Sequence, residues 1–238
     1  MHQTIIEKSN KIVLEEESHS YHLLDSDIEF KSVTEFINMF FNPFNEQKIS
    51  KKLSGTGKYI NMSPQDIIKD WELRRLRGTL VHKEIEDFIN NKFKITDRQK
   101  LDLKSQQGIN FLNKKCINKH NYLFSEVRIY SEQLKLAGTI DLMLYSKQRN
   151  RIYLIDWKTN VEIKKKGYKK GTHAATSIIE DCSFNKYNLQ LTLYQYILEK
   201  YYNSKVDGTY IVHLTNLDYN IIKCEYQKET IEKMLESV

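Results

Sequence analysis

The spacing of apolar residues changes along the chain, and each change marks a different kind of element. Between residues 11 and 31, short apolar patches separated by polar turns predict strands in a hairpin. Between residues 32 and 118, apolar residues recur every three or four positions, which predicts helices. We place these helices at residues 32–41, 45–53, 64–76, 78–91 and 97–118.

After residue 118 the apolar period shortens to two, which is typical of strands. We expect strands at 122–130, 134–145 and 151–158, a helix at 186–203, strands at 207–214 and 220–226, and a helix at 228–237. This order predicts an α/β protein with a central mixed sheet and helices on both faces. Residues 1–77 would form an N-terminal hairpin and a mostly helical extension, either part of the same domain or a lobe that covers the substrate, and residues 78–238 would form the core.

Composition narrows the class of protein. The 238 residues are 40% hydrophobic, enough for one large domain or two small ones. The three cysteines lack metal-binding spacing, so a zinc ribbon, an iron–sulfur cluster and a disulfide framework are disfavoured, and a reducing, intracellular compartment is expected. We see no signal peptide and no membrane-spanning run. The net charge of +6 suits an acidic polymer such as nucleic acid without requiring one.

The stretch "LIDWKTN" ends an apolar strand with charged residues. Residues two apart in a strand share a face, so Asp156 and Lys158 point the same way and Trp157 points the other way. If the strand before it pairs symmetrically about the connecting loop, Asp141 lies opposite Asp156 to within one residue, an offset that a bulge could absorb. Two carboxylates brought together repel unless a cation lies between them, and oxygen-rich groups suit Mg²⁺ or Mn²⁺.

A simpler interpretation makes Asp156 and Lys158 a surface ion pair and Asp141 a turn residue. An isolated Asp-x-Lys usually means no more than that. Here, however, Asp141 lies inside the apolar stretch "TIDLMLY", where solvation is a poor explanation. The pattern therefore favours a site over a surface pair.

Four segments together resemble a known superfamily. They are "GTLVHKEIE" with His82, "GTIDLMLY" with Asp141, "YLIDWKTN" with Asp156 and Lys158, and "LQLTLYQY" with Gln190 and Tyr194. In this order they resemble the PD-(D/E)XK nucleases, in particular the RecB-like branch, and are similar to mitochondrial-type and phage single-strand DNA exonucleases. The literal Pro-Asp is absent because Ile140 precedes Asp141, and no four-cysteine cluster is present.

The resemblance implies a restriction-endonuclease-like core and one or two Mg²⁺ or Mn²⁺ ions. The implied metal ligands are His82, Asp141, Asp156 and the backbone carbonyl of Trp157. Lys158 would stabilise the attacking group and the charge that develops on the phosphate, and Gln190 would position the substrate or this lysine. In supporting roles, Glu126 would add a ligand or a hydrogen-bond acceptor, and Glu86 would orient His82 or a bound water.

Each of these residues also has a structural explanation. His82 shares a helical stripe with apolar residues, where a core histidine is common, and Glu126 could be an ordinary strand residue at the surface. Gln190 and Tyr194 lie four apart on one helical face, which could be a polar stripe or tyrosine-rich core.

Basic and aromatic residues near the motifs could bind nucleic acid. Tyr187 and Tyr194 could stack on bases of a single strand. Two groups of cations could contact phosphates, although a charge run is often only solvated: Lys164, Lys165, Lys166, Lys169 and Lys170, and Arg74, Arg75 and Arg77.

The sequence therefore predicts a metal-dependent deoxyribonuclease, an exonuclease acting on single-stranded DNA or DNA ends in replication, repair or recombination. A structure-selective endonuclease is one alternative. A catalytically inactive nucleic-acid-binding subunit of a helicase or recombination complex is another. Expected partners are DNA and a helicase, recombinase or replication complex.

Overall fold

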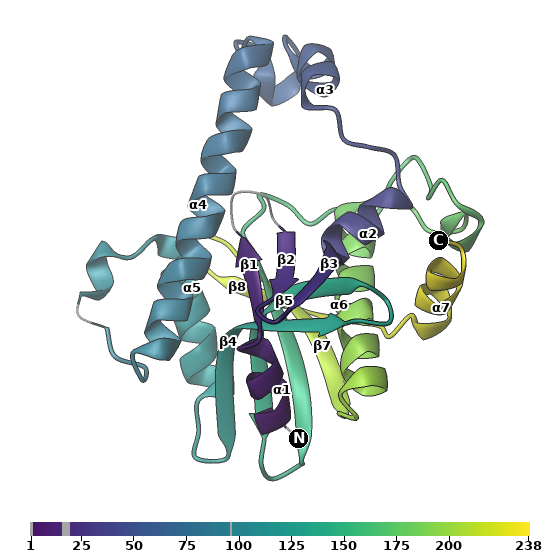
Figure 1. Cartoon of the computed structure of the whole chain (residues 1–238). Helices are drawn as coiled ribbons and strands as arrows, with labels where there is room; N and C mark the ends of the chain where they lie inside the picture. The colour runs from purple at the N-terminus through teal and green to yellow at the C-terminus, as the bar shows by residue number, and fades with distance from the viewer. Residues whose placement is uncertain (1, 16–19, 96) are drawn as a thin grey trace.

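A mixed sheet with helices on both faces forms the body of the protein (Figure 1), which confirms the predicted fold class. The computed structural model describes residues 2–15, 20–95 and 97–238. Within these residues the sheet contains eight strands: β1 (Ile12–Glu15), β2 (Ser20–Leu23), β3 (Ser26–Ser32), β4 (Asn121–Ser131), β5 (Leu136–Ser146), β6 (Arg151–Lys158), β7 (Val206–Leu214) and β8 (Tyr219–Cys224).

The helices of the described residues include the predicted ones and one more at the N-terminal end. The α-helices are α1 (His2–Ser9), α2 (Val33–Met39), α3 (Glu46–Leu53), α4 (Pro64–Asn90), α5 (Leu103–Phe111), α6 (Ser183–Tyr201) and α7 (Lys228–Glu236). Shorter 3₁₀ turns are η1 (Gly57–Tyr59), η2 (Arg98–Lys100) and η4 (Ala174–Thr176), and η3 (Leu112–Cys116) is a π-helical turn.

The strand order combines hairpins with parallel pairs. The strands follow the order β1-β2-β3-β5-β6-β7-β8, and β4 pairs with β5. The pairs β4–β5, β5–β6 and β7–β8 are antiparallel, whereas β3–β5 and β6–β7 are parallel. A parallel pair needs a long crossover, which α6 provides between β6 and β7. The N-terminal hairpin thus extends the main sheet through β3.

Helix α4 corrects the prediction of two helices at 64–76 and 78–91. It runs without a break from Pro64 to Asn90, and it begins after Ser63, whose hydroxyl accepts from the backbone N–H of Asp66. Gly78 does not end the helix. It lies where a Cβ atom would be 3.1 Å from Thr159 Oγ1, so it allows a close approach of helix and sheet. The predicted division of the chain at residue 77 therefore falls inside a helix.

The predicted helix at 97–118 is also divided differently. Asp102 caps α5 by accepting from the backbone N–H of Lys104, so the helix begins at Leu103. Its last turn continues as the π-helical turn η3, which ends at Cys116. The helix that crosses from β6 to β7 was expected at 186–203 and is found at Ser183–Tyr201.

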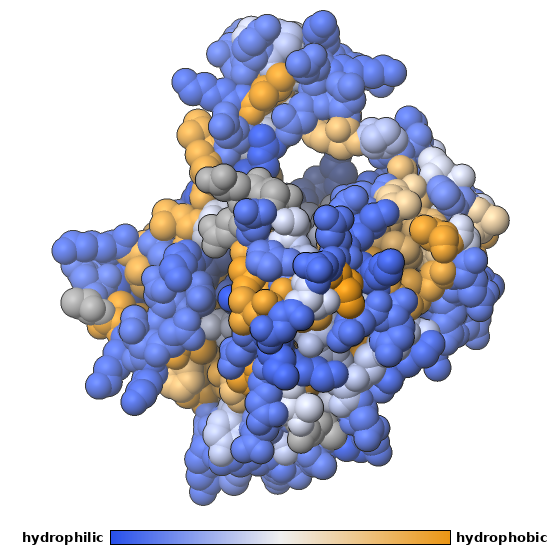
Figure 2. Space-filling model, viewed as in Figure 1, coloured by the Kyte–Doolittle hydropathy of each residue, from blue (hydrophilic) through white to orange (hydrophobic). Residues whose placement is uncertain are grey.

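A lobe stands above the body of the protein. Residues 40–63 cross from the end of α2 to the start of α4, and they include α3 (Figure 1). Figure 2 shows an opening between this lobe and the body. Helix α4 forms one side of the opening, and the connection from α2 to α3 forms the other.

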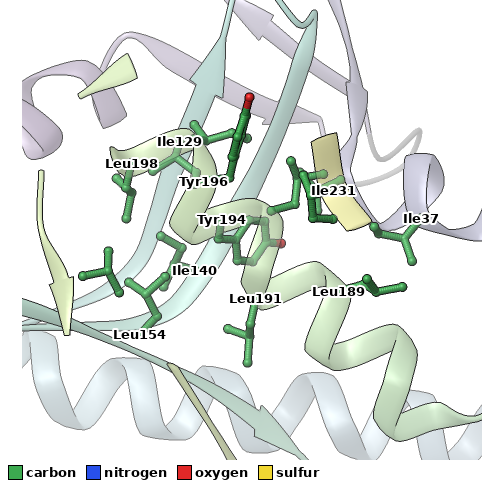
Figure 3. Packing of buried hydrophobic residues seen from close by; sticks show 14 of the residues in the cluster. Ile37, Ile129, Ile140, Leu154, Leu189, Leu191, Tyr194, Tyr196, Leu198 and Ile231 are labelled. Carbon is green, nitrogen blue, oxygen red and sulfur yellow. The ribbon is translucent and has the colours of Figure 1, made fainter. Parts of the chain in front are cut away.

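Two apolar cores cover the two faces of the sheet. On one face, α2 and α6 pack against the strands and α7 packs against α6, through residues such as Ile37, Leu191 and Ile231 (Figure 3). On the other face, α4 and α5 pack through residues such as Ile85 and Ile109. No helix within the described part of the chain is both long enough and apolar enough to cross a membrane.

Candidate metal centre

Strands β5 and β6 bring the two predicted aspartates opposite each other. The pairing register includes Leu142 with Ile155 and Ser146 with Arg151, and it contains no shift between these pairs. Continued by one residue, it places Asp141 opposite Asp156. The predicted bulge is therefore not needed, because the true register already pairs these two positions.

Asp141 and His82 meet at the backbone of Trp157. The backbone N–H of Trp157 donates to Asp141 Oδ2 at 2.8 Å. Nδ1 of His82 lies 3.6 Å from the same carboxylate oxygen, and Nε2 lies 3.2 Å from the carbonyl oxygen of Trp157. The ring of Trp157 points into the opposite core, where it contacts Phe111 edge-on. Three of the four expected ligand groups thus come together, and Trp157 anchors them.

Glu126 joins this group from the neighbouring strand β4. It lies between the pairs Ser125–Leu142 and Val127–Ile140, which places it opposite Asp141. Its φ of 49° is in the left-handed region, which is unfavourable for a glutamate inside a strand. Such backbone strain is common where a side chain is directed to a functional position.

The side chains of His82, Glu126 and Asp141 form what we call the carboxylate cluster. One potential ligand atom from each lies within 4.8 Å of the others. Burial, followed by the nearby charges of Asp141, Glu86 and Asp156, raises the pKa of Glu126 to about 8. At neutral pH the Glu126 carboxyl group therefore favours its protonated form, and a bound cation would favour the charged form instead.

The donor set fits a divalent cation. Carboxylate oxygens, a backbone carbonyl and an imidazole nitrogen are ligands that Mg²⁺ and Mn²⁺ accept, whereas no thiol lies in the cluster. His82, Glu126, Asp141 and the Trp157 carbonyl would hold the ion. Glu126 was expected only in a supporting position and here lies among the candidate ligands.

Asp156 and Lys158 form a second charged group, which we call the lysine pair. Lys158 Nζ lies 2.5 Å from Asp156 Oδ2, and both side chains are largely buried. Burial raises the pKa of Asp156 to about 6, although Lys158 acts in the opposite direction. For Lys158, burial alone would lower the pKa, but the charges of Asp156 and Asp141 outweigh it and raise the pKa. Lys158 is therefore held as a cation beside the carboxylate cluster.

Tyr187 fixes the position of this lysine from the side of α6. Nζ of Lys158 lies 4.5 Å from the centre of the Tyr187 ring, a cation–π contact. The Tyr187 hydroxyl donates to Asn160 Oδ1 at 3.2 Å. Asn160 follows the strand and was not singled out in the sequence, because nothing local marks it as a neighbour of α6.

Tyr194 corrects the expectation that it stacks on bases. Its ring is only 3% exposed and belongs to the core between α6 and the sheet (Figure 3). A Cβ atom on Gly138 would approach this ring to 2.5 Å, so glycine is required there. Gln190 donates to the Tyr194 hydroxyl at 3.1 Å, which places this amide at the edge of the packed tyrosine.

The predicted phosphate-binding cations differ in whether their charged groups are already paired within the protein. The five lysines of the basic loop (Lys164, Lys165, Lys166, Lys169 and Lys170) are all exposed. Arg77, in contrast, makes a bidentate ion pair with Asp102 at 2.7 and 2.9 Å, so its guanidinium is committed to holding α4 against α5. Arg74 and Arg75 pair with Asp70 and Glu46 at the surface.

Two further residues, Glu86 and Lys104, lie in surroundings that the sequence did not predict. Glu86 accepts from Lys83 and Asn90, and no contact joins it to His82 among the described interactions. Lys104, which the sequence did not single out, donates to the carbonyl of Thr159 beside the lysine pair. Burial and the nearby charge of Arg77 lower the pKa of Lys104, although Asp102 opposes them. Only the packing of α5 against α4 brings it there.

Comparison with known proteins adds little to this description. No protein-family model and no curated protein matches the chain. Among solved structures, a protein named SSO0001 is similar to it at 12% identity and a TM-score of 0.40, over 100% of this chain and 84% of that one.

Proposed function

We propose that the protein is a metal-dependent nuclease that hydrolyses phosphodiester bonds of DNA. One observation carries the proposal: the carboxylate cluster and a buried, cationic lysine lie side by side at the same end of β5 and β6. A structural ion pair would explain Asp156 and Lys158 but would not explain why His82, Glu126 and Asp141 are brought together beside it.

The roles of the residues follow from charge. When bound, a divalent cation polarises a phosphate oxygen and lowers the pKa of water, which is the chemistry that hydrolysis requires. His82, Glu126 and Asp141 hold and orient that ion. Lys158, kept protonated by Asp156, stabilises the negative charge that develops on the phosphate in the transition state. Asp156 and Tyr187 position the ammonium group.

The opening beside α4 favours an exonuclease. Helix α4 carries His82 and forms one side of the opening in Figure 2. In this proposal a single strand enters the opening by a free end. We therefore propose single-stranded DNA or DNA ends as substrate, with the exposed lysines of the basic loop holding phosphates outside the site.

The deciding experiment measures cleavage of end-labelled linear single-stranded DNA with Mn²⁺, with Mg²⁺ and with EDTA. We expect metal-dependent loss of nucleotides from the wild-type protein and none from Lys158→Ala. A circular single strand of the same sequence separates the alternatives, because an exonuclease leaves it intact and an endonuclease opens it.

Binding without cleavage would favour another class of protein. If wild-type protein binds the labelled strand but no divalent cation supports cleavage of linear or circular DNA, the nuclease proposal is wrong. The protein would then be a nucleic-acid-binding subunit of a larger repair or replication complex. In either case we propose that it works inside the cell with reduced cysteines; all three are buried and free.

A further inference from the structure

A second site lies at the other end of the same strands. A cavity of about 390 Å³ opens between the sheet and the end of α5, within the size range of ligand pockets. Phe111, Leu144, Ile155 and Tyr210 form apolar walls, and Ile221, which is 45% exposed, lies at its mouth. Leu144 is three residues beyond Asp141 on β5, about 10 Å along the strand.

Cations surround the mouth of this cavity. Lys115 and Arg149 line it, and both are exposed. Lys114 is exposed next to Lys115, and Lys223 is the cross-strand neighbour of Tyr210. An apolar cavity with a positive rim suits an apolar side chain that is flanked by carboxylates.

Two of the polar side chains that line the cavity, Asn121 and Tyr153, are already hydrogen-bonded. Asn121 donates its side-chain amide to the carbonyl of Cys116 at 2.9 Å. The Tyr153 hydroxyl donates to Asp207 at 2.5 Å and accepts from Arg149 at 3.0 Å, which also fixes the guanidinium at the rim. A nucleobase has polar edges that would lose their hydrogen bonds here, whereas an aromatic or aliphatic side chain loses none.

The wall of the cavity includes a π-helical turn. Lys115 and Cys116 belong to the π-helical turn η3, which replaces the last turn of α5. Turns of this kind are rare and are often found at functional sites. Here the turn directs Lys115 to the rim and opens the space above Leu144.

We infer that this cavity binds a partner protein through an acidic peptide segment that places a phenylalanine or a large aliphatic side chain between Phe111 and Ile221. The carboxylates of the segment lie against Lys115, and Arg149, which also lies 3.8 Å from Asp207, adds positive charge at the rim. The cavity shares no lining residue with the carboxylate cluster or the lysine pair.

The test is fluorescence anisotropy without divalent cations, so that it does not depend on the metal centre. The probe is a short labelled peptide of aspartates followed by two phenylalanines, and the matched control peptide has serines in place of the phenylalanines. We expect the control peptide to bind about tenfold more weakly or worse, since one buried anchor usually dominates such binding. Ile221→Glu and Lys115→Glu should each weaken the binding of the probe by a similar factor.

Lys233→Glu on α7 is the matched charge control and should leave the affinity for the probe unchanged. The inference is overturned if both peptides bind equally, or if Lys233→Glu weakens binding as much as Lys115→Glu does. It is also overturned if a single-stranded oligonucleotide displaces the probe and if Lys115→Glu weakens the binding of that oligonucleotide. The surface would then bind nucleic acid. Thermal melts of each variant confirm that the exposed substitutions leave the fold intact.

Discussion

The carboxylate cluster and the lysine pair lie at the same end of β5 and β6, yet they handle charge in opposite ways. In the lysine pair, Asp156 and Lys158 compensate each other at 2.5 Å. In the cluster, Glu126 and Asp141 share only a histidine, and the pKa of Glu126 rises to about 8, first through burial and then through its acidic neighbours. The lysine pair carries its own cation, whereas the cluster has none within it. Under the proposed function, this difference separates metal binding from charge stabilisation.

The largest effect should come from the residue that both regions share. Asp141 faces His82, Trp157 and Asp156, so Asp141→Asn should remove Mn²⁺ binding measured by calorimetry. Cleavage of single-stranded DNA should fall by at least about a thousandfold, since both the ion and its orientation are lost. Full Mn²⁺ affinity in this variant would mean that the ion is held elsewhere.

Lys158→Ala should separate the two regions. We expect cleavage to fall by about a hundredfold to a thousandfold while Mn²⁺ still binds, because the cluster itself is unchanged. The ion pair of Lys186 with Asp181, at 2.8 Å, offers a matched control outside the site. Lys186→Ala should destabilise the fold to some degree without a comparable loss of activity. Equal losses in the two variants would reduce Lys158 to a structural role.

Glu126→Gln tests whether the buried carboxyl group of Glu126 destabilises the metal-free protein beside its acidic neighbours. The neutral amide should weaken Mn²⁺ binding by about tenfold to a hundredfold, similar to the loss of other residues that support a metal. The metal-free variant should melt at a higher temperature than the metal-free wild type, because one buried acidic group is gone. Ser125→Ala, at the adjacent position, is the control. A lower melting temperature for the metal-free Glu126→Gln protein would contradict the repulsion.

The smallest effect should come from outside both regions. Replacing Lys165 and Lys166 of the basic loop by alanine should weaken binding of single-stranded DNA a few-fold and reduce the salt dependence of binding. Mn²⁺ affinity should not change. If the salt dependence stays the same, these lysines are solvated and do not contact phosphates.

Several site residues could be predicted because the sequence pattern that marks them spans only a few neighbouring residues. Asp156, Trp157 and Lys158 alternate along one strand, so their faces follow from the strand period. His82 was singled out by the resemblance of its segment to a nuclease motif, and helical spacing placed it on the apolar stripe of its helix. The register of β5 with β6 was almost right, because a short connecting loop restricts how two strands can pair.

Other residues depended on contacts that no local pattern encodes. Tyr194 looked available to bases, but α6 buries it over Gly138. Arg77 looked free, but the packing of α5 against α4 brings Asp102 to it. Lys104 reached the site for the same reason.

The sequence by itself determined the order of the strands and of most helices, the α/β class and the strand that carries Asp156 and Lys158, because these depend on periodicity over a few residues. Only the tertiary structure decided that Glu126 turns toward His82, that α4 continues through Gly78 beside Thr159, and that a cavity remains beneath η3. Those features depend on the packing of distant segments and on electrostatic interactions between residues far apart in the chain.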